Sequence, residues 1–100
     1  MILVRVVFHT KWGKADEVIA GLKESIATMP SPGQGKVRIL SDLSGESFTI
    51  VIEQVHESLA AWEQFRANMF SNPQFQEGTG RSDDLILSGR TEYYTIEAEF

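Results

Sequence analysis

Two segments of the chain alternate apolar side chains with a second, mixed set at the period of a β-strand. In Ile2–His9 the alternating sets are Ile2, Val4, Val6 and Phe8 against Leu3, Arg5, Val7 and His9. In Glu46–Val55 they are Phe48, Ile50 and Ile52 against Thr49, Val51 and Glu53. Successive side chains of a strand leave on opposite faces, so one face is wholly apolar and we expect helices to cover it. The other face is half apolar and half charged, which is typical of a subunit interface or the wall of a ligand cavity.

Two segments show the period of a helix. Lys14–Met29 repeats apolar residues every three or four positions, and the proline-rich Pro30–Gly33 predicts its end. A second helix is expected from Leu59, with Ser58 as its N-cap and Asn72-Pro73 at its end. Its apolar stripe consists of Leu59, Trp62, Phe65 and Met69.

The remaining pattern predicts two more strands. Apolar and polar residues alternate in Lys36–Asp42, which predicts a short strand. The tight connection Leu43–Gly45 predicts that this strand pairs antiparallel with the strand that follows. Gln76–Arg81 is expected to be a loop, Asp83–Leu87 a short helical piece, and Arg90–Phe100 the last strand. In that strand we expect Tyr94, Ile96, Ala98 and Phe100 to face the helices, and Tyr93, Thr95, Glu97 and Glu99 to face away.

The predicted order is strand, helix, strand, strand, helix, strand. This order indicates one α+β domain over residues 1–100 with a ferredoxin-like antiparallel sheet and both helices on one face. The opposite face is too apolar for water, so we expect two copies to pack sheet against sheet as a homodimeric α/β barrel.

Composition narrows the classes of partner. The net charge is −5, which disfavours nucleic acid and anionic membranes as partners. There are no cysteines, so thiolate metal sites and cysteine nucleophiles are excluded, and we expect a cytoplasmic protein. The apolar start is expected to be a strand rather than a signal peptide, because Arg5 interrupts it and no basic leader precedes it.

Four polar residues share the mixed face: Arg5, His9, Arg38 and Glu53. One hypothesis is a polar pocket for an anionic or phenolic ligand, with His9 and Arg5 as catalytic residues and Arg38 and Glu53 as ligand contacts. The other is an ion-pair network at the subunit interface, in which Arg5 and Arg38 neutralise Glu53. The sequence leaves both open.

A second candidate is the aromatic stripe of the second helix. Trp62, Phe65 and Met69, together with Tyr94, would line an apolar ligand pocket or belong to the ordinary core. The second histidine, His56, is interpreted as a solvated residue at the start of the helix. Because the two histidines lie on different elements, we expect neither a metal site nor a cofactor.

Four short stretches carry a resemblance to a known group of proteins: Trp12–Glu17, Glu53–Trp62, Phe70–Phe75 and Ser88–Tyr94. In order and spacing they resemble the dimeric α/β-barrel proteins, the group that includes NIPSNAP-like proteins and the antibiotic biosynthesis monooxygenases. The resemblance covers nearly the whole chain.

The resemblance implies a homodimer with its sheets face to face. It also implies, for some members, cofactor-independent oxygenation of aromatic phenols, while others have no known activity. Two positions depart from relatives: Met69 stands where oxygenase-like versions often have a histidine, and the first strand lacks the asparagine of haem-degrading relatives. The functional expectation is therefore oxygenation of a small phenolic molecule, or else a non-catalytic dimeric binding or assembly module.

Overall fold

The computed structural model describes residues 1–27, 37–73 and 83–100. Along the chain the elements are β1 (Ile2–Thr10), α1 (Ala15–Ala27), β2 (Arg38–Ser41), β3 (Thr49–His56), α2 (Leu59–Phe70), the 3-10 turn η1 (Asp83–Leu85) and β4 (Ile86–Thr95).

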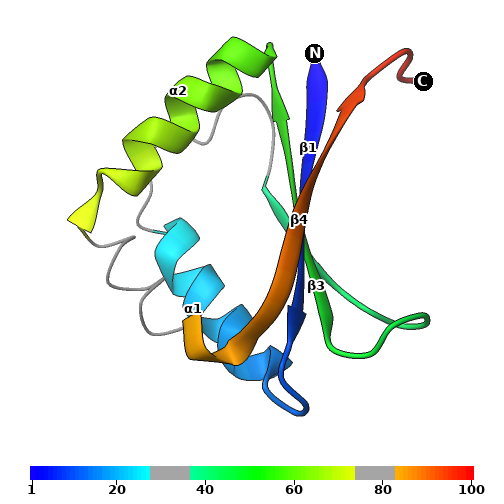
Figure 1. The fold of residues 1–100 in the computed structure, drawn as a ribbon. Helices are drawn as coiled ribbons and strands as arrows, with labels where there is room; N and C mark the ends of the chain where they lie inside the picture. Colours follow the sequence, from blue (N-terminus) through cyan, green and yellow to red (C-terminus); the bar gives the residue numbers. More distant parts are fainter. Residues whose placement is uncertain (28–36, 74–82) are drawn as a thin grey trace.

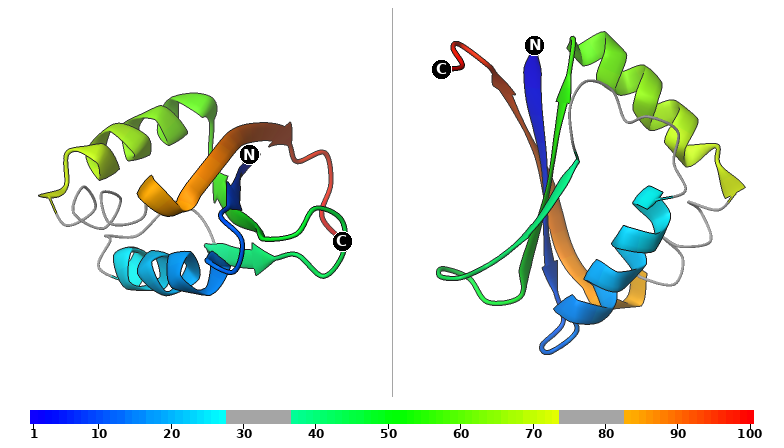
Figure 2. Two further views of the ribbon diagram at one scale, coloured as in Figure 1. Left: turned by 60° about the horizontal axis from the view of Figure 1, so that its bottom comes forward. Right: turned by 180° about the vertical axis from the view of Figure 1, so that it is seen from behind.

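The strands form a sheet in the order β2-β3-β1-β4, and every neighbouring pair is antiparallel. Both helices lie on the same side of this sheet (Figure 1), and the two further views in Figure 2 agree. No described element covers the other side, which we call the open face. The predicted α+β ferredoxin-like arrangement is confirmed.

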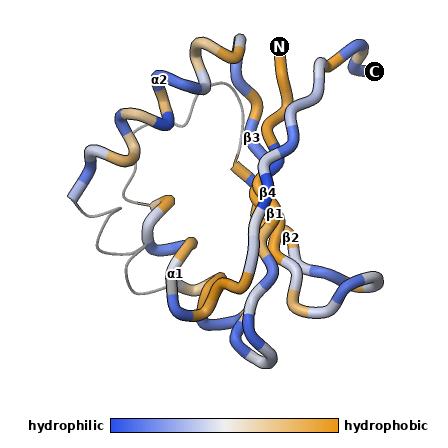
Figure 3. Tube along the Cα trace, in the orientation of Figure 1, coloured by the Kyte–Doolittle hydropathy of each residue, from blue (hydrophilic) through white to orange (hydrophobic). Residues whose placement is uncertain are grey.

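The core lies between the sheet and the helices. Val4 of β1, Ile50 of β3 and Val18 of α1 are completely buried. The apolar residues concentrate in the strands, most visibly along β1, while the loop that joins β2 and β3 is mainly polar (Figure 3). Burial of this apolar face, at roughly 25 cal/mol per Å², is the main force that holds the helices on the sheet.

The N-terminus of α2 follows the predicted capping pattern. Ser58 has an extended backbone, with φ at −158°, and its hydroxyl accepts a hydrogen bond from the Ala61 N–H at 3.1 Å. This satisfies one of the backbone donors that a helix leaves unpaired at its start. α2 then ends at Phe70, before the predicted Asn72-Pro73 boundary.

Both ends of β3 differ from the prediction. β3 begins only at Thr49, because the residues before it form the turn of the hairpin, in which Phe48 has a left-handed φ of 58°. It also runs one residue further than expected and so includes His56. In that turn the Phe48 ring meets the exposed Trp12 ring edge-on, with centroids 4.7 Å apart.

β4 starts four residues before the predicted Arg90 and ends at Thr95 instead of Phe100. Its register pairs Val4 with Tyr93 and Leu3 with Tyr94. Tyr93 therefore shares the helix-covered face with Val4, and Tyr94 lies on the open face. The expected faces of this strand were wrong by one residue.

The predicted first helix is present as α1, which begins one residue later than expected. The expected helix end at Pro30–Gly33 and the loop at Gln76–Arg81 lie outside the described residues.

Candidate functional site

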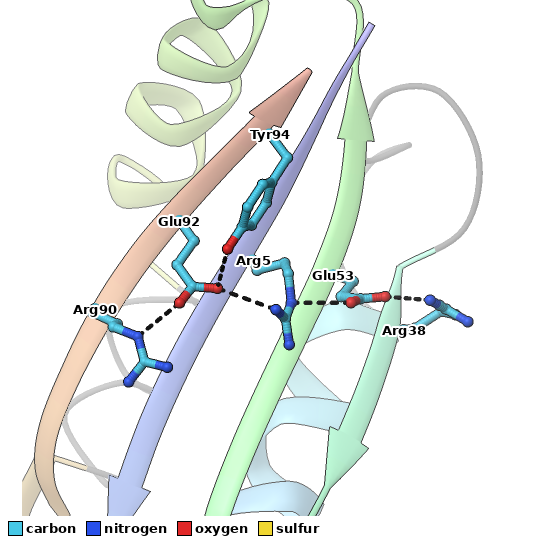
Figure 4. A network of polar contacts seen from close by, with 6 residues as sticks. All are labelled: Arg5, Arg38, Glu53, Arg90, Glu92 and Tyr94. Carbon is cyan, nitrogen blue, oxygen red and sulfur yellow. Dashed lines mark hydrogen bonds and ion pairs between the residues drawn. The ribbon is translucent and has the colours of Figure 1, made fainter. Parts of the chain in front are cut away.

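Four charged residues stand in one line across the open face, each on a different strand. Arg38 of β2 pairs with Glu53 of β3, Glu53 pairs with Arg5 of β1, and Arg5 pairs with Glu92 of β4. We call Arg38, Glu53, Arg5 and Glu92 the charge row; its signs alternate from one edge of the sheet to the other (Figure 4).

Neighbours in the charge row contact each other directly. Arg5 Nε lies 3.2 Å from Glu53 Oε2, and Arg5 Nη1 donates to Glu92 Oε1 at 3.2 Å. Arg38 Nη2 donates to Glu53 Oε1. Two guanidinium nitrogens of Arg5 are therefore paired with carboxylates of its own sheet.

Two further residues of β4 complete the network at Glu92. Arg90 Nε donates to Glu92 Oε2 at 2.8 Å, and the Tyr94 hydroxyl donates to Glu92 Oε1 at 3.2 Å (Figure 4). The hydrogen bond from Arg90 is the main reason that the pKa of Glu92 lies below its ordinary value. Glu92 was not among the residues predicted for the site, because the face of β4 was assigned wrongly.

Apolar positions flank the charge row on both sides. Toward one end of the sheet the register places Val55, Leu3 and Tyr94 side by side. Toward the other end it places the apolar Leu40, Val51 and Val7 side by side, with the charged Arg90 next to Val7 on β4. The open face thus has the mixed character that the strand alternation predicted.

His9 lies on the same strand as Arg5 but at the far end of the open face. Its Nδ1 is 3.1 Å from Thr49 Oγ1, and its Nε2 is 3.6 Å from Glu46 Oε2. Four residues along a strand span about 13 Å, so the structure separates His9 from Arg5 rather than joining them in one pocket.

The helix-covered side holds a different group of polar and aromatic side chains. His56, at the end of β3, packs against two rings of α2: its centroid is 5.2 Å from that of Trp62 and 5.1 Å from that of Phe65. His56 Nε2 bonds Gln54 Oε1 at 3.0 Å, and Trp62 Nε1 donates to the Tyr93 hydroxyl at 3.2 Å. We call Gln54, His56, Trp62, Phe65 and Tyr93 the aromatic cluster.

The aromatic cluster contains a titratable group, His56, whose pKa is shifted. His56 is only 2% exposed, and burial lowers the pKa of its imidazole below the ordinary value. The ring is therefore neutral at pH 7. Because Gln54 Oε1 is an acceptor, Nε2 carries the hydrogen and Nδ1 carries the lone pair that could take up a proton.

The interpretation of His56 as a solvated turn residue was wrong. The alternation of β3 continues through Ile50, Ile52, Gln54 and His56, which places the imidazole on the helix-covered face. Extending the predicted strand by one residue beyond Val55 would have identified this position from the sequence.

The other predicted ligand contacts are divided between the two sides of the sheet. Trp62 and Phe65 lie in the aromatic cluster, and Met69 is partly buried one turn further along α2. Tyr94 lies on the open face, so Tyr93 takes the position beside Trp62 that Tyr94 was expected to fill.

Within residues 1–27, 37–73 and 83–100, no three histidine or carboxylate side chains gather in a way that could hold a metal ion. The helices of the same residues include none long and apolar enough to span a membrane.

Comparison with known proteins finds similarity in structure. No family model and no curated protein sequence matches the chain. A NIPSNAP-like domain protein from Burkholderia xenovorans is 15% identical with a TM-score of 0.85, over 97% of this chain and 85% of that one. A NIPSNAP family protein from Agrobacterium tumefaciens is 17% identical with a TM-score of 0.83, over 94% and 90%.

A third structure, from Chloroflexus aurantiacus, is named provisionally as an antibiotic biosynthesis monooxygenase. It is 19% identical with a TM-score of 0.73, over all of this chain and 97% of that one. Identities this low establish a common fold and leave activity open. The chain has the fold of the NIPSNAP and antibiotic biosynthesis monooxygenase structures, as its sequence resemblance implied.

Proposed function

We propose that the protein is a homodimer that binds a small electron-rich phenolic molecule at the aromatic cluster and oxidises it without a cofactor. The observation that carries the proposal is a buried, neutral imidazole, His56, set among aromatic rings and oriented by Gln54. Apolar sites with a few convergent polar groups and a perturbed pKa are the usual setting for small-molecule chemistry.

The proposed chemistry needs one base and molecular oxygen. His56 Nδ1 takes a proton from a carbon activated by a neighbouring phenol or ketone, and the resulting carbanion attacks oxygen. The hydroperoxide formed loses water, so a CH₂ group becomes a carbonyl while one O₂ is consumed and one water is released. Trp62 donates to the Tyr93 oxygen, which leaves the Tyr93 hydroxyl hydrogen available to an oxygen of the ligand.

The test is oxygen uptake with a panel of anthrone-like phenols. His56→Gln should lower the rate by roughly 10²–10⁴-fold, the usual contribution of a general base. His9→Gln is the matched control, because His9 lies on the opposite face, and it should keep the wild-type rate. If His9→Gln loses activity and His56→Gln keeps it, the base is on the open face and this proposal fails.

A second candidate is a non-catalytic module whose sheet face serves assembly. It is favoured by the charge row, in which Arg5 and Glu53 each contact two partners of opposite charge and are committed to each other rather than to a ligand. This candidate predicts no oxygen uptake with any phenol. It also predicts that Glu53→Gln weakens dimerisation in sedimentation equilibrium, and an unchanged dissociation constant would count against it.

A further inference from the structure

The neutral imidazole of His56 is closed off from solvent. His56 is 2% exposed, and Trp62, whose ring lies against it, is 4% exposed. A molecule of the size of a phenol cannot reach His56 Nδ1 past side chains that are buried to this extent. The site therefore needs a part that opens, and moving parts of this kind are common where an enzyme site excludes water.

The strand order shows which side chain closes the site. β1 lies between β3 and β4, and Val4 on β1 pairs with Gln54 on one side and Tyr93 on the other. His56 on β3 is therefore two strand spacings, about 10 Å, from the strand that carries Tyr93. The indole of Trp62 joins them, because its ring lies against the imidazole and its Nε1 donates to the Tyr93 hydroxyl at 3.2 Å. It thus reaches across β1 from β3 to β4.

The outer end of this bridge meets the solvent. Tyr93 is 45% exposed although it lies on the helix-covered face, whereas Trp62 and His56 behind it are buried. α2 itself leaves the end of β3 and inclines away from the strands toward its C-terminus (Figures 1 and 2). Exposure thus rises from His56 through Trp62 to Tyr93, so a ligand would approach the imidazole from the β4 side.

We infer that the Trp62 indole is the gate to His56, and that its hydrogen bond to Tyr93 is the latch that holds the gate shut. This inference rests on the proposed function, since only a ligand that must reach His56 requires the opening. A neutral hydrogen bond shifts an equilibrium by roughly two- to tenfold. A latch of that strength favours the closed form, and local fluctuations still open it.

Acylation by diethyl pyrocarbonate tests the gate without any turnover, because this small reagent acylates the neutral imidazoles that it can reach. The rates at His56 and His9 are measured separately from the masses of their peptides. Tyr93→Phe removes the latch but keeps the ring, and it should raise the rate at His56 roughly two- to tenfold. The rate at His9, on the open face, is the internal reference and should not change. Tyr94→Phe, also on the open face, is the matched control and should leave both rates as in the wild type.

Two further variants separate the latch from a general loosening of the fold. Val18→Ala removes buried methyl groups on α1 and lowers global stability without touching the latch, so the rate at His56 should stay the same. Trp62→Phe removes the N–H donor, and adding Tyr93→Phe to it should raise the rate no further. The inference is overturned if Tyr93→Phe gives no rise, if Val18→Ala gives an equal rise, or if the two latch variants act multiplicatively.

Oxygen uptake with the phenol panel separates this inference from the proposed function. If Tyr93→Phe speeds the acylation of His56 in a protein that oxidises no phenol, the proposed function fails and the gate stands. If the wild type consumes oxygen through His56 while Tyr93→Phe leaves the acylation rate unchanged, the latch fails and the proposed function stands.

Discussion

At the scale of single residues, the two histidines have opposite surroundings. His9 contacts Thr49 and the exposed Glu46 at the rim of the open face, whereas His56 is enclosed by the rings of α2. The second setting strips water from the imidazole and lowers its pKa. Which histidine can serve as a neutral base is thus decided by burial, which the residue type does not reveal.

The pKa of His56 gives a prediction for stability against pH. An unfolded chain has a histidine pKa near 6.5, and the native value is lower, so the unfolded state binds more protons as pH falls below 6.5. The contribution of neutral His56 is fully present above pH 6.5 and is lost between that pH and its native pKa. The loss is at most about 1.4 kcal/mol per pH unit.

Urea unfolding at a series of pH values between 7.5 and about 5 measures this loss, since the histidine range lies there. His56→Gln should flatten the fall in the free energy of unfolding. If the free energy of unfolding falls equally with pH in wild type and His56→Gln, His56 is not the cause of the fall.

Glu53 gives a second residue-scale prediction. Its side chain is 10% exposed, and its carboxylate lies between Arg5 and Arg38. Glu53→Gln removes the charge but keeps the shape, and it should lower the free energy of unfolding by about 1–2 kcal/mol, since Arg5 keeps Glu92 as a partner. Urea unfolding measures the change. The exposed Glu99→Gln is the control, and an equal effect of both variants would rule out a specific role for the row.

At the scale of elements, periodicity and capping predicted the described helices and strands with small errors at their ends. α1 and α2 follow from their apolar stripes, and Ser58 marks the start of α2. β4 is the exception, because Tyr93 and Tyr94 put the same side chain on both faces. Which side chains of β4 face the helices is set by the register of its hydrogen bonds with β1. The sequence of β4 alone does not specify that register.

The cap of α2 can be tested by substitution. Ser58→Ala removes the hydroxyl that accepts from the Ala61 N–H, and it should destabilise the protein by about 1 kcal/mol. Ser58→Asp supplies another acceptor and should restore most of that stability. Thermal and urea unfolding measure both variants; a Ser58→Ala protein as stable as Ser58→Asp would mean that the cap contributes little.

At the scale of the whole molecule, the helices cover only one side of the sheet. Val51 and Leu40 remain partly exposed on the open face beside charges that neutralise one another. A surface of this kind is typical of a contact with a partner, and the homodimer proposed above would cover it.

Dimerisation through the open face predicts a specific sensitivity at Val51. Val51→Thr keeps the shape but places a hydroxyl in the apolar part of the contact, and it should raise the dissociation constant about tenfold. Leu59→Thr on α2 is the control and should leave the dissociation constant unchanged. Sedimentation equilibrium measures both, and equal constants for wild type and Val51→Thr would contradict the interface.

The sequence by itself determined the α+β order of elements and the two kinds of sheet face, because these depend on the spacing of residues along the chain. It placed Arg5, Arg38 and Glu53 on one face but left their ion pairing as one of two alternatives. Only the tertiary structure decided that Glu92 completes the charge row, that Tyr93 rather than Tyr94 meets Trp62, and that His56 is buried. Each of these depends on strand register or on helix packing, which bring together residues that are far apart in the sequence.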